Sequence, residues 1–427
     1  MVLSLAWQYS QEQGGPMRGS SVPGKKHVQG NPLEFHLRMF AAALREAGYR
    51  DRAMCSKLRL LADLGHWLKR TGQSLASNLE EHLLEAFVKH KQRMQQMHRG
   101  DSKTLQQFLA HLRKTGVVSS RKLIPDQSPL ARILVCYEQH LLLERRLASA
   151  TVFNYLSFAR KFLVERFPEG PFLLNELRAS DISDFVLRCC RGMSVGTAQI
   201  MTTAFRSFFR FLFQKGELQA NLAACVPSVA DRRLSTVPKY LTPEAVELVL
   251  KASNRSTAIG RRDYAILLLL ARLGFRAGEV IALQLEDIKW RAGEILVRGK
   301  GLLHDRMPLP ADVGEILASY LRQDRPVCQT RRVFVCARSP RRCFDRSCAV
   351  ALIVRRALLR AGLDPAVKGA HLFRHSLATS LLHSGATMEE IGEVLRHRDP
   401  STTEIYAKVD FDGLRSLAHH WPMGGAQ

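Results

Sequence analysis

Six side chains in the C-terminal half of the sequence are of the types that can bind a phosphate and attack it. They are two arginines, a lysine, two histidines and a tyrosine: Arg276, Lys300, His371, Arg374, His397 and Tyr406. Guanidinium groups suit a phosphodiester, because each presents a planar fork of donors and stays charged. A tyrosine hydroxyl beside them can act as a nucleophile. The set therefore predicts a phosphate site with a covalent nucleophile, assembled from distant segments by folding.

Tyr406 is the predicted nucleophile, and the other five side chains would make its attack possible. A phenol has a pKa near 10, so it needs nearby cations and an acid–base group to lose its proton at neutral pH. We expect His371 to be that group, and Lys300 to protonate the leaving sugar hydroxyl. The pentacoordinate phosphorus would be stabilised by Arg276, Arg374 and His397. Because a phosphotyrosine ester keeps the energy of the broken bond, we expect no cofactor and no metal.

The composition indicates a polyanionic partner. The 427 residues hold 63 Lys+Arg against 39 Asp+Glu, a formal net charge of +24, and nucleic acid is the commonest partner of so basic a protein. A membrane-surface or ribosome-bound protein is the alternative on charge alone. The nine cysteines form no CxxC pair, which favours free thiols in a reducing cytoplasm over a zinc framework. The apolar run 265–271 is too short to span a membrane, and residues 1–7 lack the features of an export signal.

Composition and apolar spacing divide the chain into segments. They are a disordered basic arm (1–34), a helical segment (35–122), a second, DNA-binding helical segment (128–224), a basic proline-bearing linker (225–240), a last, catalytic domain (241–410) and a tail (411–427). The first helical segment carries apolar residues at three- and four-residue spacing, namely Leu58, Leu61, Leu64, Trp67 and Leu68. A linker of this kind would let two domains close around a duplex.

The second helical segment carries candidate DNA contacts. A helix over 197–215 is expected to turn four apolar residues inward: Ile200, Phe205, Phe208 and Leu212. Arg206 and Arg210 lie four residues apart on another face, where they could follow a phosphate backbone. A simple solvated face is the alternative for either arginine. Ser149 is expected to cap a preceding helix that has Phe153 on its apolar stripe.

The two helical segments resemble each other in sequence. Four positions match at a constant offset of 100, because Leu105, Phe108, Leu112 and Gly116 correspond to Phe205, Phe208, Leu212 and Gly216. Phe87-Val88 matches Phe185-Val186 at an offset of 98. We predict that a DNA-gripping helical module is duplicated. Two unrelated amphipathic helices remain the alternative, since they share such spacing easily.

The last domain is expected to be helical with one small hairpin. Helices are expected from Thr242 onward and over 262–273, 277–283, 348–361, 371–383 and 388–396. Two short strands, 294–298 and 306–309, flank a tight turn that carries Lys300. The expected fold class is therefore mainly α with a small β-hairpin or sheet, in an α+β catalytic domain.

These residues and their context resemble the tyrosine recombinase (phage integrase) family over residues 128–410. The resemblance rests on Gly274-Phe275-Arg276-Ala277-Gly278-Glu279, on Asp287-Ile288, and on His371-Leu372-Phe373-Arg374-His375-Ser376-Leu377-Ala378-Thr379, with Gly385 and Ile391 also in place. It implies that the six residues named first are the catalytic set and that Glu279 supports the first arginine. It also implies a helical core-binding domain and an integrase-type catalytic domain that form a C-shaped clamp on double-stranded DNA.

The resemblance further implies a site-specific recombinase that acts as a homo-tetramer on two DNA sites, with a dimer on each site. Strand exchange would pass through a Holliday junction, by this chain alone or with partner recombinases. The segment 1–122 is longer than a minimal recombinase needs, which favours the integrase of a mobile genetic element. One position departs from the family, because Leu395-Arg396-His397 stands where Leu-Gly-His is usual. Arg396 does not freely adopt the backbone angles open to Gly, and it is a third candidate DNA contact.

Three other functions use some of the same residues. A type IB topoisomerase shares the chemistry but relaxes supercoils as a monomer, and a non-catalytic DNA-binding protein could keep the fold. A metal-dependent hydrolase could be built on four histidines: His371, His375, His383 and His397. Neither an acidic residue nor a cysteine stands at ligand spacing to them, and Arg374 would repel a cation. We expect His375 and His383 to be structural, and the target DNA sequence is not readable from these residues.

Overall fold

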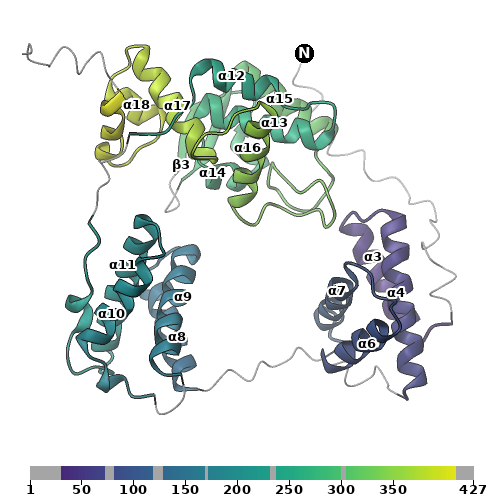
Figure 1. The fold of residues 1–427 in the computed structure, drawn as a ribbon. Coiled ribbons are helices and arrows are strands. Elements are labelled where there is room, and N and C mark those ends of the chain that lie inside the picture. Colours follow the sequence, from purple (N-terminus) through teal and green to yellow (C-terminus); the bar gives the residue numbers. More distant parts are fainter. Residues whose placement is uncertain are drawn as a thin grey trace, which may run out of the picture. The chain divides into compact units, whose positions relative to one another are not determined.

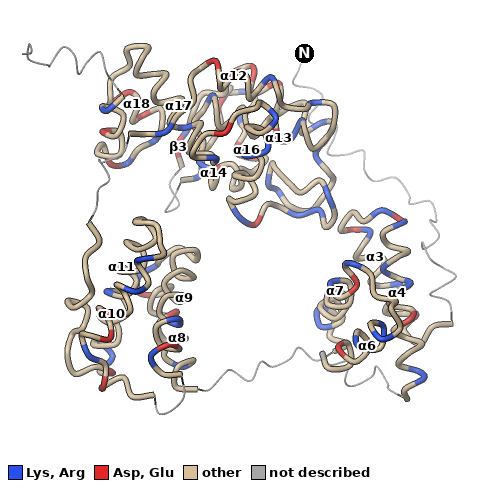
Figure 2. The backbone as a smooth tube through the Cα atoms, in the orientation of Figure 1, with Lys and Arg blue, Asp and Glu red and all other residues tan. Residues whose placement is uncertain are grey.

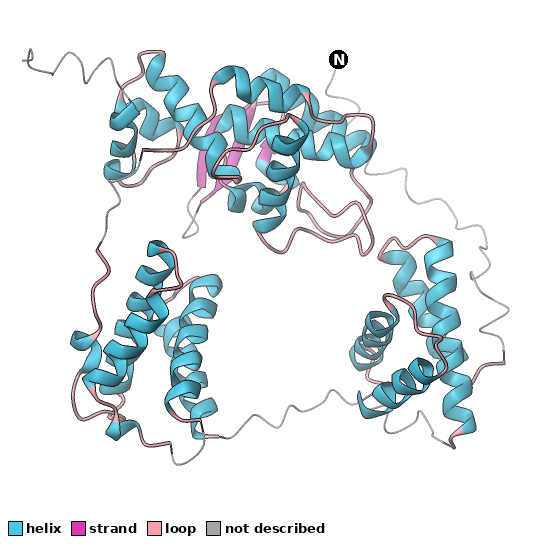
Figure 3. Ribbon diagram, viewed as in Figure 1, coloured by secondary structure: helices cyan, strands magenta, loops and turns pink. Residues whose placement is uncertain are grey.

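A computed structural model describes residues 30–72, 81–118, 128–168, 172–230, 237–299 and 304–409. The chain divides into two compact units, residues 119–233 and the remainder, 1–118 with 234–427. Both units are mostly helical, and the strands of the described part form one small sheet (Figures 1 and 3). The predicted fold class is thereby confirmed. Most of the predicted basic arm, the tail 411–427 and Lys300 lie outside the described residues.

Four helices form the first described part of the chain: α3 (Glu34–Glu46), α4 (Asp51–Arg70), α6 (Glu81–Arg93) and α7 (Asp101–Lys114). They enclose an apolar core of their own, in which Leu58, Leu61 and Leu64 are fully buried. Trp67 is only partly buried and lies against Phe87 of α6, with ring centroids 5.6 Å apart. The spacing of the leucines therefore predicts this core correctly.

The described residues of the unit 119–233 form four α-helices: α8 (Pro129–Gln139), which continues into a π-helical turn (His140–Glu144), α9 (Ser149–Arg166), α10 (Ala179–Cys190) and α11 (Val195–Gln214). Short 3₁₀ turns cover Leu174–Glu176 and Leu222–Cys225. Its core is rich in phenylalanine, because Phe162 meets Phe185, Phe205 and Phe209 edge-on at centroid distances of 5.2–5.7 Å. Edge-to-face packing adds to the apolar burial that holds the helices together.

Three local expectations in this unit are wrong. Ser149 is the first residue of α9 and does not cap it, because Ala148 occupies the cap position and no side chain bonds there. Ile200 is 45% exposed and Phe153 is 67% exposed. Each lies one residue from the position that faces the core, which Met201 and Val152 occupy. One residue turns a helix by about 100°, so spacing alone places an apolar stripe less accurately than packing does.

The two sets of four helices share part of their contact pattern. In the first set α4 contacts α3 and α7, and in the second α9 contacts α8 and α11. The matched residues are buried in both sets, on α7 as Leu105, Phe108 and Leu112 and on α11 as Phe205, Phe208 and Leu212. Each helix is followed by a glycine with positive φ, 72° at Gly116 and 74° at Gly216. The duplication stays a prediction that superposition of the two sets would test.

The remaining described residues, 237–299 and 304–409, are built around one buried helix. Its helices are α12 (Pro243–Lys251), α13 (Ala258–Leu273), α14 (Ala277–Ala282), α15 (Ala311–Ser319), α16 (Cys348–Arg360), α17 (Ala370–His383) and α18 (Met388–Val394). Helix α13 contacts α12, α15, α16 and α17, which explains its nearly continuous run of apolar residues. Thr242 caps α12 as expected, since its hydroxyl accepts a hydrogen bond from the Ala245 amide at 3.3 Å.

Three short antiparallel strands, β1 (Ile288–Lys289), β2 (Glu294–Arg298) and β3 (His304–Pro308), pair in the order β1-β2-β3. Arg298 pairs with His304 at the loop end of the β2–β3 hairpin, so the connection between these residues carries Lys300. Strand β3 begins two residues before its predicted start at 306, and α18 ends at Val394 rather than at 396. Such boundaries depend on pairing and capping more than on apolar pattern.

A smaller apolar cluster lies at the end of the described chain. It contains Ala378, Ile391, Leu395, Tyr406 and Val409. The last two belong to a 3₁₀ segment (Glu404–Val409), which follows a 3₁₀ turn (Pro400–Thr402). Tyr406 is therefore fixed by packing against α17 and α18. Across the described ranges, no helix has the length and apolar character needed to cross a membrane.

Phe205→Ala should destabilise the unit 119–233 by about 3–5 kcal/mol, because it leaves a cavity at the centre of the aromatic core. Phe213→Ala is the matched control on the same helix, and its side chain is 41% exposed. Denaturant unfolding followed through this unit should show a large midpoint shift for the first variant and a small one for the second. Equal shifts would contradict the assignment of the core.

Candidate active site

Five of the six predicted catalytic residues come together at the C-terminal ends of α13 and α18, on α17 and in the last 3₁₀ segment. Arg276 precedes α14, His371 and Arg374 lie on α17, and His397 follows α18. The rings of His397 and Tyr406 are parallel, with centroids 6.5 Å apart and an interplanar angle of 2°. The cluster joins residues up to 130 positions apart in the sequence (406 − 276). Lys300, the sixth residue, lies outside the described part of the chain.

Arg374 is buried at the centre of this cluster, with 3% of its surface exposed. Its Nη1 donates to the Gly274 carbonyl at 2.6 Å, and its Nη2 donates to the Leu395 carbonyl. Gly274 has φ of 59°, and a Cβ there would lie 2.9 Å from the Leu395 side chain. Glycine is therefore required where α13 ends, and its carbonyl is one of two that fix the guanidinium. Burial lowers the pKa of Arg374 to about 9, with the charges of Arg276 and Arg396 adding to the effect, so it stays protonated at neutral pH.

Arg276 is oriented by a carboxylate three residues along the chain. Its Nη1 donates to Glu279 Oε1 at 2.6 Å, and its backbone amide donates to Oε2 at 2.8 Å. Its Nη2 also donates to the Arg396 carbonyl at 3.3 Å. The side chain is 37% exposed, whereas that of Glu279 is 5% exposed. Arg276 is therefore the more accessible of the two predicted phosphate-binding arginines, and its approach is set from behind by a buried acid.

Arg396 points inward, which corrects its place among the candidate DNA contacts. Its side chain is 5% exposed, and Nη2 donates to Glu279 Oε2 at 2.8 Å. Nη1 lies against the Leu273 carbonyl and Met307 Sδ, and the guanidinium is 5.3 Å from the centroid of the Phe275 ring. Its φ is 57°, which is the left-handed backbone that explains why glycine suits this position. The long side chain turns into the protein, where it shares the carboxylate with Arg276.

Glu279 therefore accepts hydrogen bonds from two guanidinium groups, those of Arg276 and Arg396. Burial raises its pKa, but the charges of Arg396 and Arg276 and hydrogen bonds from Arg276 outweigh this effect and hold the pKa below its ordinary value. Glu279 is ionised at neutral pH. The cluster holds three arginines and this one carboxylate, because Arg374 donates to two backbone carbonyls and not to an acid. The excess of positive charge matches a phosphodiester, whose transition state carries more negative charge than its ground state.

The two predicted catalytic histidines are neutral at pH 7. Burial, followed by the charges of Arg374 and Arg276, lowers the pKa of His397 to about 4. The same causes in the same order lower the pKa of His371, although part of its ring is exposed. His397 Nδ1 is hydrogen-bonded to the Thr403 hydroxyl at 2.8 Å, and Thr403 is buried. Thr403 thus fixes the ring orientation, a role that the sequence interpretation missed.

Tyr406 is buried, and its hydroxyl meets a histidine other than the expected one. Burial raises the pKa of Tyr406 to about 12, and the charges of Arg374 and Arg276 oppose this only in part. His375 Nδ1 lies 2.9 Å from the hydroxyl, whereas His371 lies one turn back along α17, with its ring centroid 6.2 Å from that of His375. Residues four apart share a helix face, so the spacing of the two histidines is the signal that could have indicated this contact.

A buried aspartate anchors the hairpin that carries Lys300. Asp287 is 1% exposed and accepts hydrogen bonds from Nε and Nη2 of Arg298 at 2.7–3.1 Å. Arg298 is the last residue of β2. The start of the loop between β2 and β3 is therefore fixed two residues before Lys300. Within the described ranges, no group of three or more His, Cys, Asp or Glu side chains could hold a metal ion.

The candidate DNA contacts on α11 differ from each other. Blue segments, which mark Lys and Arg, recur along this helix in Figure 2. Arg210 is exposed. Arg206 is half-buried, and its Nη2 donates to the Val226 and Pro227 carbonyls and to the Ser228 hydroxyl at 3.0–3.2 Å. Arg206 therefore holds the end of the unit against α11, and Arg210 is the better placed of the two to meet a phosphate.

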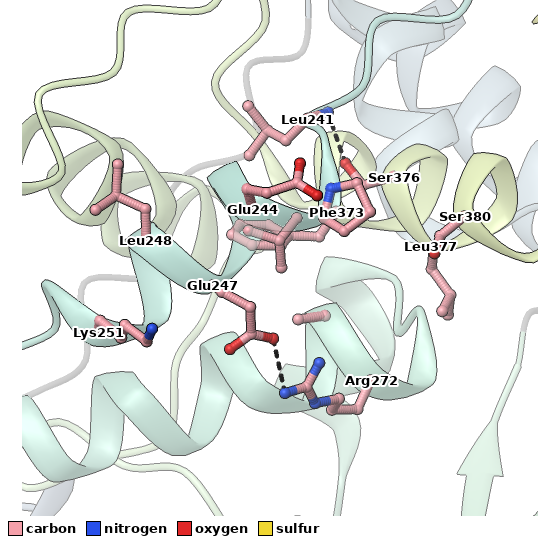
Figure 4. Close-up of a pocket in the computed structure, with 13 residues that line it drawn as sticks. Leu241, Glu244, Glu247, Leu248, Lys251, Arg272, Phe373, Ser376, Leu377 and Ser380 are labelled. Atoms are coloured by element: carbon pink, nitrogen blue, oxygen red, sulfur yellow. Dashed lines mark hydrogen bonds and ion pairs between the residues drawn. The ribbon is translucent and has the colours of Figure 1, made fainter.

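A hollow among the described residues 237–409 is separate from the arginine cluster. It has a volume of about 520 Å³ and lies among α12, α13 and α17 (Figure 4). The Leu241 amide donates to the Ser376 hydroxyl on one side at 2.8 Å, and Arg272 pairs with Glu247 on the other at 2.8 Å. None of the described catalytic candidates lines it. The phosphate chemistry therefore belongs to the arginine cluster and not to this pocket.

Known proteins are similar to this chain in sequence and in fold. The model of the phage integrase family matches residues 239–412. The protein y4rA of Sinorhizobium fredii, named an integrase/recombinase, is 41% identical over 93% of this chain and 96% of its own length. The tyrosine recombinase XerD of Mycobacterium tuberculosis is 30% identical over 67% of this chain and 96% of its own. XerH bound to a palindromic difH substrate has a similar fold, with a TM-score of 0.53 at 18% identity over 94% of this chain and 98% of its own.

Glu279→Gln should cost about 3–5 kcal/mol of folding free energy, because it leaves two guanidinium groups without their buried carboxylate. Arg396→Gly should cost less, since Glu279 keeps Arg276 and glycine accepts the left-handed backbone. The depressed pKa of Glu279 stabilises the fold above about pH 4.5, and this contribution is lost as the pH falls further. Denaturant unfolding at about pH 7 and pH 3.5 should therefore show the deficit of Glu279→Gln at the higher pH and a smaller one at the lower. A loss of unfolding free energy that is the same at both pH values would contradict the assignment of Glu279 as an ionised, ion-paired carboxylate.

Proposed function

The chain belongs to the phage integrase family of tyrosine recombinases and is a tyrosine-type site-specific recombinase, and on that premise we propose that Tyr406 cleaves DNA through a 3′-phosphotyrosine intermediate. The observation that carries the proposal is the burial of the Tyr406 hydroxyl within a cluster of arginine and histidine side chains that has an excess of positive charge. Membership of this family decides against the type IB topoisomerase and the metal-dependent hydrolase. The double-stranded DNA is held so that one phosphate meets this cluster.

Arg276 and Arg374 bind the scissile phosphate. Arg276 is partly exposed and meets the non-bridging oxygens first, while Glu279 keeps its guanidinium in one orientation. Arg374 lies deeper and supplies a fixed charge. Preorganised charges of this kind need no rearrangement as negative charge develops on phosphorus, so they favour the transition state over the ground state.

The histidines act as neutral hydrogen-bond donors to the phosphate. With the ring hydrogen of His397 on Nε2, its Nδ1 accepts the hydrogen bond of the Thr403 hydroxyl, and Nε2 donates to a phosphate oxygen. His371 lies on α17 one turn from Arg374 and has a depressed pKa, which supports a similar role at neutral pH. Two neutral donors add hydrogen bonds without adding charge to a cluster that is already strongly positive.

Lys300 is the proposed general acid for the leaving 5′ oxygen. The β2–β3 pairing and the Asp287–Arg298 pair fix both ends of its hairpin. Cleavage breaks the bond between phosphorus and the 5′ oxygen, which takes a proton from Lys300, and the 3′ phosphate remains on Tyr406. Religation reverses each step. The bond energy is conserved in the ester, so the exchange of strands needs no external energy source.

The helical unit 119–233 serves as the core-binding module, and we propose residues 34–118 as a second copy of it. In both sets the second helix contacts the first and the fourth. Residues 34–118 hold 15 Lys+Arg against 8 Asp+Glu, and residues 128–230 hold 12 against 8, so both carry the positive charge that phosphate contacts require. The second module would lengthen the DNA segment that one chain holds.

The assembly is proposed as a homo-tetramer on two DNA sites, with a dimer on each site. Strand exchange would use this chain alone or together with partner recombinases. A structure of lambda integrase, similar in fold with a TM-score of 0.50 at 17% identity over 69% of this chain and 99% of its own, is a dimer bound to a core site. The long N-terminal segment and the integrase/recombinase name of a full-length relative support a mobile genetic element as the source of the DNA. Strand exchange through a Holliday junction follows if each dimer cleaves one strand at a time.

Tyr406→Phe should abolish the covalent DNA–protein product on a suicide substrate, because the ring packing remains while the nucleophilic oxygen is lost. Tyr320→Phe is the matched control, since Tyr320 is equally buried in the same domain, beside Phe334. Both variants should keep their affinity for duplex DNA. Covalent product that survives in Tyr406→Phe would show that another residue is the nucleophile.

Arg210→Ala should weaken duplex binding similarly for all sequences and reduce the dependence of log affinity on log salt by about one ion, as expected for one lost phosphate contact. Arg188→Ala is the control, because Arg188 is exposed in the same unit but pairs with Glu165. Affinities measured between low and physiological salt give the slope. An unchanged slope for Arg210→Ala, or an equal change for both variants, would argue against a contact through α11.

A further inference from the structure

His375 is a partly buried titratable group that neither the predicted catalytic set nor the mechanism above uses. It lies on α17, one turn after His371 and directly after Arg374. Its Nδ1 is 2.9 Å from the Tyr406 hydroxyl, and the two rings meet edge-on with centroids 5.7 Å apart. This is the hydrogen bond that the structure describes for the nucleophilic oxygen.

The protonation states on the two sides of this hydrogen bond are complementary. Burial, followed by the charges of His371 and Arg374, lowers the pKa of His375 to about 4, so its ring is neutral at pH 7. The phenol is protonated at the same pH, because burial raises its pKa. The neutral ring has one nitrogen with a free lone pair. With the ring hydrogen on Nε2, that lone pair is on Nδ1 and faces the phenolic proton.

We propose that His375 is a further catalytic residue, which accepts the Tyr406 proton through Nδ1 during cleavage and returns it during religation. The inference rests on the proposed role of Tyr406 as nucleophile. In cleavage the phenolic O–H bond breaks, the proton moves to Nδ1, and the phenolic oxygen bonds to phosphorus. The bond from phosphorus to the 5′ oxygen then breaks, and this oxygen takes its own proton from the general acid. Religation moves both protons back.

The surrounding charges couple this proton transfer to the arrival of DNA. His371 and Arg374 face His375 from α17, and Arg276 and His397 adjoin the cluster from the ends of α13 and α18. Without a phosphate, the positive charges of Arg374 and Arg276 oppose an imidazolium. A phosphodiester bound by Arg276 and Arg374 places a negative charge beside them and favours the imidazolium. The free protein therefore keeps its nucleophile protonated, and the bound phosphate enables its activation.

A different role for the same contact would be to hold Tyr406 in a buried position that must be released before attack. The two roles predict opposite results when the contact is removed. Loss of a proton acceptor slows cleavage, whereas loss of a clamp leaves cleavage unchanged or speeds it. An amide at position 375 separates them further, because Asn places an acceptor oxygen near the Nδ1 position but does not take up a proton at neutral pH.

The test compares the full chain with His375→Ala and His375→Asn in single-turnover cleavage of a suicide duplex, with the covalent product measured on denaturing gels. Both variants should cleave about 10²- to 10⁴-fold more slowly, which is the usual effect of a missing acid–base group. Duplex affinity and thermal unfolding of His375→Asn should stay close to those of the wild type. His383→Ala, at the exposed end of the same helix, is the matched control and should cleave at the wild-type rate.

A second substrate, in which sulfur replaces the bridging 5′ oxygen, identifies the proton that is affected. A thiolate leaves without a general acid, because thiols are much stronger acids than alcohols. The defect of Lys300→Ala should therefore be rescued on this substrate, and the defect of His375→Ala should persist. Rescue of His375→Ala by sulfur, wild-type rates in His375→Asn, or faster cleavage in His375→Ala would each overturn the inference. A wild-type chain that forms no covalent product would instead contradict the proposed function itself.

Discussion

The interaction on which the site depends is the buried carboxylate of Glu279 between two guanidinium groups. Arg276 and Arg396 both donate to it, and Arg276 also donates to the Arg396 carbonyl. Arg396 is buried and could not be so without the acid, since an unpaired charge in the interior costs several kcal/mol. The shared acid therefore joins the start of α14 to the end of α18, and it sets the direction in which Arg276 meets solvent.

Burial and this concentration of charge together set the protonation of the neighbouring groups. Burial, with the positive charges adding to it, keeps His371, His375 and His397 neutral, and burial keeps the phenol of Tyr406 protonated. In the proposed mechanism such a site is inactive without substrate, because the Tyr406 hydroxyl holds its proton and His375 is a weak base. A bound phosphodiester favours the protonated form of His375, so that substrate binding strengthens the group that accepts the proton. This is a benefit for a protein whose reaction breaks DNA.

The sequence allows much of this site to be predicted, but not its internal contacts. Arg276, the His371–Arg374 pair and Tyr406 are recognisable from residue type and spacing, and the core of α13 follows from its apolar run. The contact between His375 and Tyr406 and the inward direction of Arg396 depend on how α17, α18 and the last 3₁₀ segment pack. Ile200 is a similar case in the helical unit, because its exposure depends on which side of α11 the neighbouring helices cover. The contacts between side chains are therefore set by long-range packing, which the local sequence pattern does not reveal.

Arg396 shows how one substitution can be accommodated at a position built for glycine. The left-handed backbone at φ of 57° costs a non-glycine residue roughly 1–2 kcal/mol, and its Nε finds no hydrogen-bond partner among the described residues. The ion pair with Glu279 and the contact with the Phe275 ring offset that cost. A shorter or uncharged side chain would have the strain without the ion pair. Glu279 therefore explains why an arginine can occupy position 396. Arg396 in turn helps to hold Glu279 and Arg276 in place, because it donates to the carboxylate and its carbonyl accepts from Arg276.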